Sequence, residues 1–213
     1  MKTTTFSGAY GIVLGLDQET IERAKTLVKS VPAEFKPEQI HLTLFHTKLK
    51  DAPIAVVRDI TARCQEILKG HAITFKDIAT FGDNFLFWDA HKDPALMNAH
   101  HIALELATYA DTQNLAQHTK GEQLTLSDEE ADNVRLYGHP LVRDQYRPHI
   151  TLAYNGHGFS KESFPPSCLQ IGKITHAAFT EIGQFGRVLK ELTLEKEDTN
   201  VNASELTHFT KRA

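Results

Sequence analysis

One short pattern, His-apolar-Thr-apolar, occurs twice in this chain and restricts the folds that it can adopt. The copies are HLTL at 41–44 and HITL at 149–152, and their histidines are 108 residues apart. Alternate side chains of an extended strand point to opposite faces, so each copy presents its histidine and threonine together and buries its apolar pair. Composition alone predicts ~0.2 such quartets in this chain. Two copies therefore favour a fold that brings two distant strands together.

Composition and charge narrow the class of protein. The chain has 213 residues, 41% of them hydrophobic and 23% charged, which is typical of a globular protein. Its net charge of -4 gives no general attraction for a long nucleic acid, so any nucleic-acid partner should be a small nucleotide or a short RNA end. No apolar segment approaches the ~20 residues that span a bilayer. We expect a cytoplasmic monomer.

The sequence gives no sign of a metal or another cofactor. Two cysteines, Cys64 and Cys168, cannot build a disulfide framework, and no zinc-ligand spacing is present. His91, His100 and His101 lie close together in sequence, but adjacent helical residues point apart and no carboxylate completes a ligand set. We predict no metal site.

Hydrophobic periodicity predicts alternating strands and helices, which indicates an α+β fold. Strands are predicted at 9–16, 39–47, 71–81, 84–90, 149–154, 173–183 and 187–196, and helices at 17–31, 52–70, 93–110 and, shorter, within 127–140. Capping residues mark three helix starts, at Asp17, at Asp93 with Pro94, and at Ser127 with Glu130. Two β-α-β-like units, each with one His-x-Thr strand, indicate an internal duplication.

The predicted organisation is one bilobal domain over residues 1–197. A long polar connection at 111–147, with one short helix, precedes the second motif. The tail at 198–213 has little apolar pattern, which favours mobility.

The paired motifs suit chemistry on a phosphodiester. Two imidazoles on opposite sides of a phosphate can remove a proton from the attacking oxygen and donate one to the leaving oxygen. Two hydroxyls can hydrogen-bond the non-bridging oxygens. His46 is left out of this set, because a residue five positions after His41 faces the other side of a regular strand.

HLTL and PHITL resemble the two defining motifs of the 2H phosphoesterases, over roughly residues 8–195. The resemblance implies an α+β fold of two lobes related by a pseudo-twofold axis, with antiparallel sheets lining a central groove. It implies catalytic roles for His41 as acid and His149 as base, and phosphate contacts from Thr43 and Thr151. Tyr154 stands where many bacterial RNA-end members have arginine; plant-type cyclic phosphodiesterases are similar here, and Tyr154 is a third phosphate-binding candidate.

The expected function is metal-independent hydrolysis of a cyclic phosphate on a nucleotide or an RNA end. One alternative is cleavage of 2′,5′-linked or cyclic oligonucleotides; another is a non-catalytic nucleotide-binding module, which would not need both imidazoles. Among weaker candidates, Arg143 and Arg147 could supply positive charge to a phosphate. The aromatic segment Phe85–Trp88 could stack a base, although core packing is the commoner role of such residues.

Overall fold

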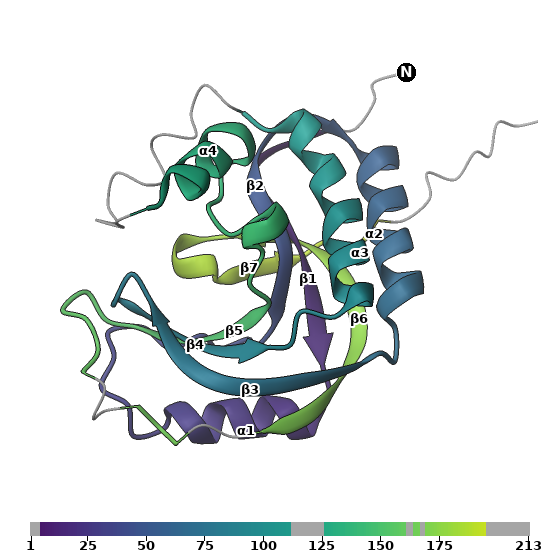
Figure 1. Ribbon diagram of the computed structural model, residues 1–213. Helices are drawn as coiled ribbons and strands as arrows, with labels where there is room; N and C mark the ends of the chain where they lie inside the picture. Colours follow the sequence, from purple (N-terminus) through teal and green to yellow (C-terminus); the bar gives the residue numbers. More distant parts are fainter. Residues whose placement is uncertain (1–4, 112–125, 161–163, 167–168, 195–213) are drawn as a thin grey trace, which may run out of the picture.

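The computed structural model describes residues 5–111, 126–160, 164–166 and 169–194 (Figure 1). The predicted tail at 198–213 and the first part of the 111–147 connection lie outside these residues. No helix in the described ranges is long and apolar enough to cross a membrane.

The strands form one seven-stranded sheet in which every pairing is antiparallel. The strand order is β1-β2-β5-β4-β3-β6-β7, and a further β1–β6 pairing closes the sheet on itself. The strands are β1 Thr5–Leu16, β2 Leu42–Pro53, β3 Ala72–Phe81, β4 Phe85–Ala90, β5 His149–Tyr154, β6 Gln170–Ile182 and β7 Val188–Glu191. The α+β class and antiparallel pairing expected from the sequence are confirmed.

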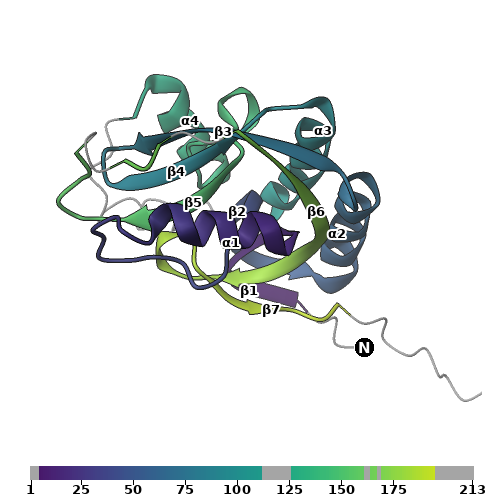
Figure 2. The ribbon, with the colours of Figure 1, turned by 90° about the horizontal axis from the view of Figure 1, so that it is seen from below.

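The closed sheet has two halves, each containing one motif strand. β2 lies beside β1 in the first half, and β5 lies beside β4 in the second. β6 serves both, because its residues 170–173 pair with β3 and its residues 174–181 pair with β1. Figures 1 and 2 show β6 running from one half into the other. At the opposite join, Leu42 of β2 pairs with Ile150 of β5.

The helices are α1 Gln18–Val28, α2 Ile54–Leu68, α3 Pro94–Ala103 and α4 Asp128–Tyr137. Three of them begin directly after their predicted capping residues, and α2 begins two residues later than predicted, because residues 52 and 53 belong to β2. Asp17 and Asp93 accept backbone N–H bonds at the starts of α1 and α3, and Ser127 forms the predicted capping box with Glu130. The helix predicted at 93–110 is divided, since α3 continues as the 3-10 turn η1, Leu104–Tyr109.

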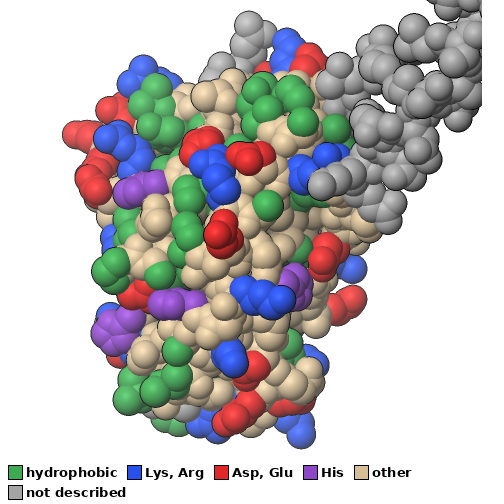
Figure 3. Space-filling model, turned by 90° about the vertical axis from the view of Figure 1, so that its right-hand side faces the viewer, with side chains coloured by type: hydrophobic (Ala, Val, Ile, Leu, Met, Phe, Trp, Pro, Cys, Tyr) green, Lys and Arg blue, Asp and Glu red, His purple; other side chains and the backbone are tan. Residues whose placement is uncertain are grey.

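The helices tie the two halves together. α1, which follows β1, contacts β5 in the other half; it lies at the bottom of Figure 1 and crosses in front of the sheet in Figure 2. α3, which follows β4, contacts β2. One hydrophobic cluster includes Leu42 and Ile150 together with residues of α1, α2 and α3. On the face shown in Figure 3, side chains of both charges are intermingled. Arg63 of α2, for example, pairs with Asp59 and Glu105.

Several strand boundaries differ from the sequence prediction. β2 runs from Leu42 to Pro53 where 39–47 was expected, and β6 begins at Gln170, three residues before its predicted start. β1 begins at Thr5 because its first residues pair with the end of β2, up to Pro53. β7 ends at Glu191, well short of the predicted residue 196, and its register with β6 runs only from Val188 to Glu191. These boundaries depend on pairing with the neighbouring strand, and the local hydrophobic periodicity of a segment carries no information about that pairing.

Candidate active site

The first motif lies at the start of β2. Leu42 and Leu44 are 0% and 1% exposed and anchor the strand in the core, whereas Thr43 is half-buried. His41 immediately precedes the strand and is 8% exposed. The predicted division of the motif into an apolar face and a polar face is confirmed.

The second motif forms the first residues of β5. Ile150 and Leu152 are both 0% exposed, and His149 and Thr151 are half-buried. The two polar side chains therefore lie on the face opposite the core, as in the first motif.

Strand register brings the two motifs together. Leu42 pairs with Ile150, and the strands are antiparallel. The cross-strand neighbours on the other face are consequently His149 beside Thr43, and Thr151 beside His41. This arrangement has approximate twofold symmetry, because each histidine lies next to the threonine of the other motif.

Both catalytic candidates are held in the same way. The Nδ1 atom of His41 lies 3.0 Å from the carbonyl oxygen of Gln39, and that of His149 lies 2.6 Å from the carbonyl of Arg147. In each case the carbonyl belongs to the residue two positions earlier. Because a carbonyl can only accept, each Nδ1 carries a proton, and the acid-base chemistry falls to Nε2.

The surroundings of the two rings differ electrostatically. Burial lowers the pKa of His149 to about 3; the positive charges of Arg147, His41 and His46 act in the same direction, and the Arg147 carbonyl opposes them. Burial also lowers the pKa of His41, but two backbone hydrogen bonds, at Gln39 and Gly186, raise it. The second backbone contact favours a proton on His41 over one on His149.

An aromatic ring and an ion pair hold the second motif in place. Phe87 of β4 stacks on His149 with ring centroids 3.6 Å apart and planes inclined by 19°. Asp89, two residues later, binds the Arg147 guanidinium through two contacts of 2.8 and 2.6 Å. Arg147 is thus committed to a carboxylate, which argues against the direct phosphate contact considered for it. Trp88, on the opposite face of β4, is 0% exposed and belongs to the core.

Each motif strand contains a bulge directly after its threonine. Between β1 and β2 the register passes from Val13 opposite Thr43 to Ile12 opposite Phe45, so that β2 carries one extra residue. Between β4 and β5 it passes from Phe87 opposite Thr151 to Leu86 opposite Ala153. In both strands the bulge lies between the residues two and four positions after the motif histidine. This match supports the internal duplication.

The bulge corrects the expected position of His46. An extra residue reverses the alternation of side chains. Leu44 and Phe45 are therefore both buried, and His46 returns to the same face as Thr43. The doubled apolar residue in the sequence was the available signal. By the same count Tyr154 returns to the face of Thr151, so His46 and Tyr154 occupy equivalent positions in the two halves.

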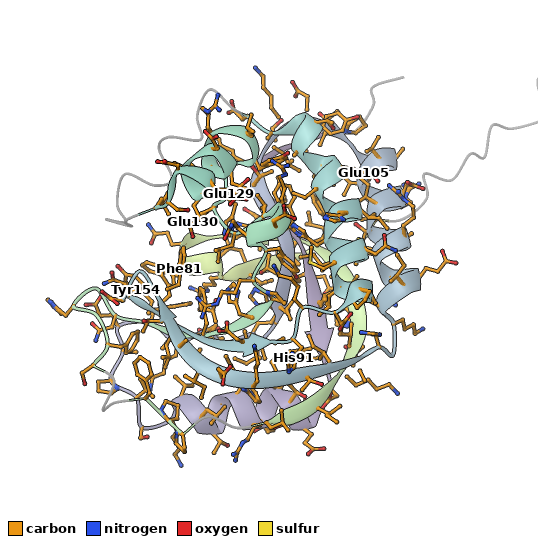
Figure 4. All side chains as sticks on the ribbon, viewed as in Figure 1. Phe81, His91, Glu105, Glu129, Glu130 and Tyr154 are labelled. Atoms are coloured by element: carbon orange, nitrogen blue, oxygen red, sulfur yellow. The ribbon has the colours of Figure 1, made fainter. Side chains whose placement is uncertain are left out.

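Tyr154 lies within an aromatic cluster at the end of β5. Its ring stacks on Phe185 at 4.1 Å and meets Phe85 at 4.9 Å. Figure 4 places Tyr154 close to Phe81, below Glu129 and Glu130 of α4. Phe185 has a positive φ of 57°, which is rare for a bulky residue and turns its ring toward Tyr154. A phosphate contact from the Tyr154 hydroxyl stays a prediction.

His100, one of the three histidines considered as metal ligands, is buried in the core. His100 is 0% exposed and neutral, since burial lowers its pKa to about 4. Within the described ranges no three His, Cys, Asp or Glu side chains are arranged to hold a metal ion.

The closed antiparallel sheet and its helices have the LigT-like fold that is expected of a 2H phosphoesterase. E. coli LigT complexed with 3′-AMP has 14% identity and a TM-score of 0.53, over 89% of this chain and 96% of that one. TT0787 of Thermus thermophilus has 16% identity and a TM-score of 0.52, over 89% and 99%. No protein-family model matches the sequence, and neither does a curated protein. The likeness at this identity is one of fold, and it confirms the fold that the motifs led us to expect.

Proposed function

We propose that this protein is a metal-independent phosphodiesterase that opens a cyclic phosphate on a nucleotide or an RNA end. The observation that carries the proposal is the matched anchoring of two histidines on adjoining strands, each with Nδ1 bound to the carbonyl two residues earlier. A purely structural histidine has no need of this repeated orientation. Two Nε2 atoms held in this way suit one phosphate group between them.

The electrostatic difference between the rings supports separate roles. His149 is neutral and keeps its Nε2 lone pair, so it accepts a proton from water as the water oxygen attacks phosphorus. The bond from phosphorus to one ribose oxygen breaks, and His41 gives its proton to that oxygen. The product is a phosphomonoester, with the second ester bond intact.

The threonines complete the phosphate site. Thr43 beside His149 and Thr151 beside His41 can donate hydroxyl protons to the non-bridging oxygens. Their hydrogen bonds strengthen as charge builds on those oxygens in the transition state. LigT, which shares the fold, has been solved with 3′-AMP and with phosphate, and this supports a phosphate-bearing ligand for the proposed site.

Product analysis tests the proposal. The purified protein is incubated in EDTA with 2′,3′-cyclic mononucleotides, cyclic-phosphate-ended RNA and 2′,5′-oligoadenylates, and the products are separated by chromatography. We expect a phosphomonoester from the cyclic phosphates, and loss of activity in His149→Ala. The exposed His157, whose side chain is 95% accessible, gives the control variant His157→Ala. Turnover of 2′,5′-oligoadenylates alone, or of no substrate, would contradict the proposal.

A further inference from the structure

His46 lies on the motif face and makes a close pair with a second histidine. Its ring meets that of His139 with centroids 4.3 Å apart at 63°. Gly11 of β1, opposite His46, makes room for it: a Cβ at Gly11 would lie 2.6 Å from the Cβ of His46 and 2.8 Å from the carbonyl oxygen of Phe45. The pair thus joins β2 to the loop that follows α4.

The loop holds His139 in a defined orientation. α4 ends at Gly138 with φ 78°, and the Asn133 side chain donates to the carbonyls of Pro140 and Val142. The Leu141 N–H donates to Nδ1 of His139 at 3.2 Å. The neutral ring therefore carries its proton on Nε2, where it can donate to a ligand.

The charged groups that lower the pKa of His139 are other histidines. Burial lowers the pKa of His139 well below its ordinary value, and His46, His149 and His100 lower it further by repulsion, whereas the hydrogen bond at Leu141 raises it. Imidazoles grouped in this way gain protons readily only when an anion is bound among them.

The spacing along the strand suits two phosphates of one nucleotide. Thr43 and His46 lie opposite Val13 and Gly11, which are two residues apart on β1. Two residues of a strand span about 7 Å, which is enough for a ribose with a phosphate ester on each side.

We propose that His46 and His139 form a second phosphate subsite, next to the catalytic pair, that binds the 5′-phosphate of the nucleotide bearing the cyclic phosphate. The inference rests on the proposed function and narrows its substrate. The preferred substrates are RNA ends and 5′-phosphorylated nucleotides, rather than nucleoside cyclic phosphates that carry a single phosphate.

Calorimetric binding at pH 6 tests this subsite without any turnover. The probes are adenosine 3′,5′-bisphosphate and adenosine 3′-monophosphate, and the proteins are the wild type, His46→Gln, His139→Gln and the control His157→Gln. Glutamine at 139 can still accept the Leu141 N–H, which helps to preserve the loop. We expect the wild type and the control to bind the bisphosphate at least about tenfold more tightly than the monophosphate. In each subsite variant this ratio of affinities should fall below about threefold.

Two outcomes would overturn the subsite: equal affinity of the wild type for both probes, or an unchanged preference in His46→Gln. Binding of the monophosphate should stay within about twofold in both variants. The experiment measures binding and not turnover. An absence of hydrolysis would therefore reject the proposed function, but the affinities for the two probes could still be compared. A folded protein that hydrolyses cyclic phosphates but has no preference for the bisphosphate would reject the subsite alone.

Discussion

At the scale of single residues, the two catalytic candidates differ in the groups that contact their rings. His41 has two backbone contacts that favour its charged form, whereas His149 lies against Phe87 with one such contact. A ribose oxygen leaves poorly without a proton, but a nitrophenolate leaves readily. His41→Ala should therefore lose about 10²- to 10⁴-fold on a 2′,3′-cyclic phosphate and much less on a nitrophenyl phosphodiester, whereas His149→Ala should lose activity on both.

Steady-state kcat/KM on the two substrates measures this difference, with circular dichroism to establish that each variant folds. If His149→Ala is the variant spared on the nitrophenyl ester, the two roles are reversed.

The ion pair behind the second motif supports a stability prediction. Asp89 and Arg147 have side chains only 14% and 28% exposed, and their contact is bidentate. Asp89→Asn removes the negative charge and should reduce the free energy of unfolding by roughly 1.5–3 kcal/mol. Asp77→Asn is the control, because Asp77 is largely exposed and lies 3.7 Å from Lys76. Urea unfolding measures the loss of stability in both variants. Equal losses would show that the buried ion pair stabilises the fold no more than the exposed one does.

At the scale of elements, the bulge in β2 is held from outside the strand. Tyr146 donates its hydroxyl to the carbonyl of Thr43 at 3.1 Å, and Nδ1 of His100 donates to the carbonyl of Leu44 at 2.7 Å. The rings of Tyr146 and His100 stack at 3.9 Å. The segment leading into the second motif is thereby attached to the first motif.

Tyr146→Phe tests whether this attachment positions Thr43. The variant keeps the stacked ring and loses one hydrogen bond, so unfolding should become easier by about 1 kcal/mol. We expect kcat on the cyclic phosphate to fall by roughly three- to tenfold with little change in KM, since the lost contact orients groups that act in the transition state. Tyr109→Phe is the control. A change confined to stability, with kcat unaffected, would remove Tyr146 from the positioning role.

The sequence predicted what local patterns determine. Caps such as Asp17 and Ser127 and the two-faced motif strands depend on neighbouring residues, and the structure confirms them. The predicted face of His46 was wrong, because a bulge depends on register with a distant strand. The two consecutive apolar residues Leu44 and Phe45 were a usable signal of that bulge. The role of His100 had no such signal, since its partners at Leu44 and Arg143 are far away in sequence.

At the scale of the whole molecule, buried neutral histidines make stability depend on pH. His100 is fully buried, and its pKa is lowered from 6.5 to about 4. The unfolded chain binds this proton more readily than the folded protein, so the stabilising contribution is complete above pH 6.5 and is lost as the pH falls toward 4. The loss for one such group amounts to roughly 3 kcal/mol.

His100→Gln should reduce this dependence, because glutamine can both donate and accept but does not titrate in this range. Urea unfolding at several pH values between 4 and 7 measures the slope, and His157→Gln should leave it unchanged. An unaltered slope in His100→Gln would assign the acid sensitivity to other groups.

In the proposed mechanism, one neutral and one protonated histidine act together on one phosphate without a metal. Initial rates on a 2′,3′-cyclic mononucleotide, measured in EDTA across pH 4 to 9, test it most directly. Because burial lowers the pKa of both His41 and His149, kcat/KM should follow a bell with its maximum below the ordinary histidine pKa of 6.5. The bound phosphate anion raises both pKa values, so the bell for kcat should lie at higher pH. A flat profile, or a complete loss of activity in EDTA that Zn²⁺ or Mn²⁺ restores, would contradict the paired-histidine mechanism.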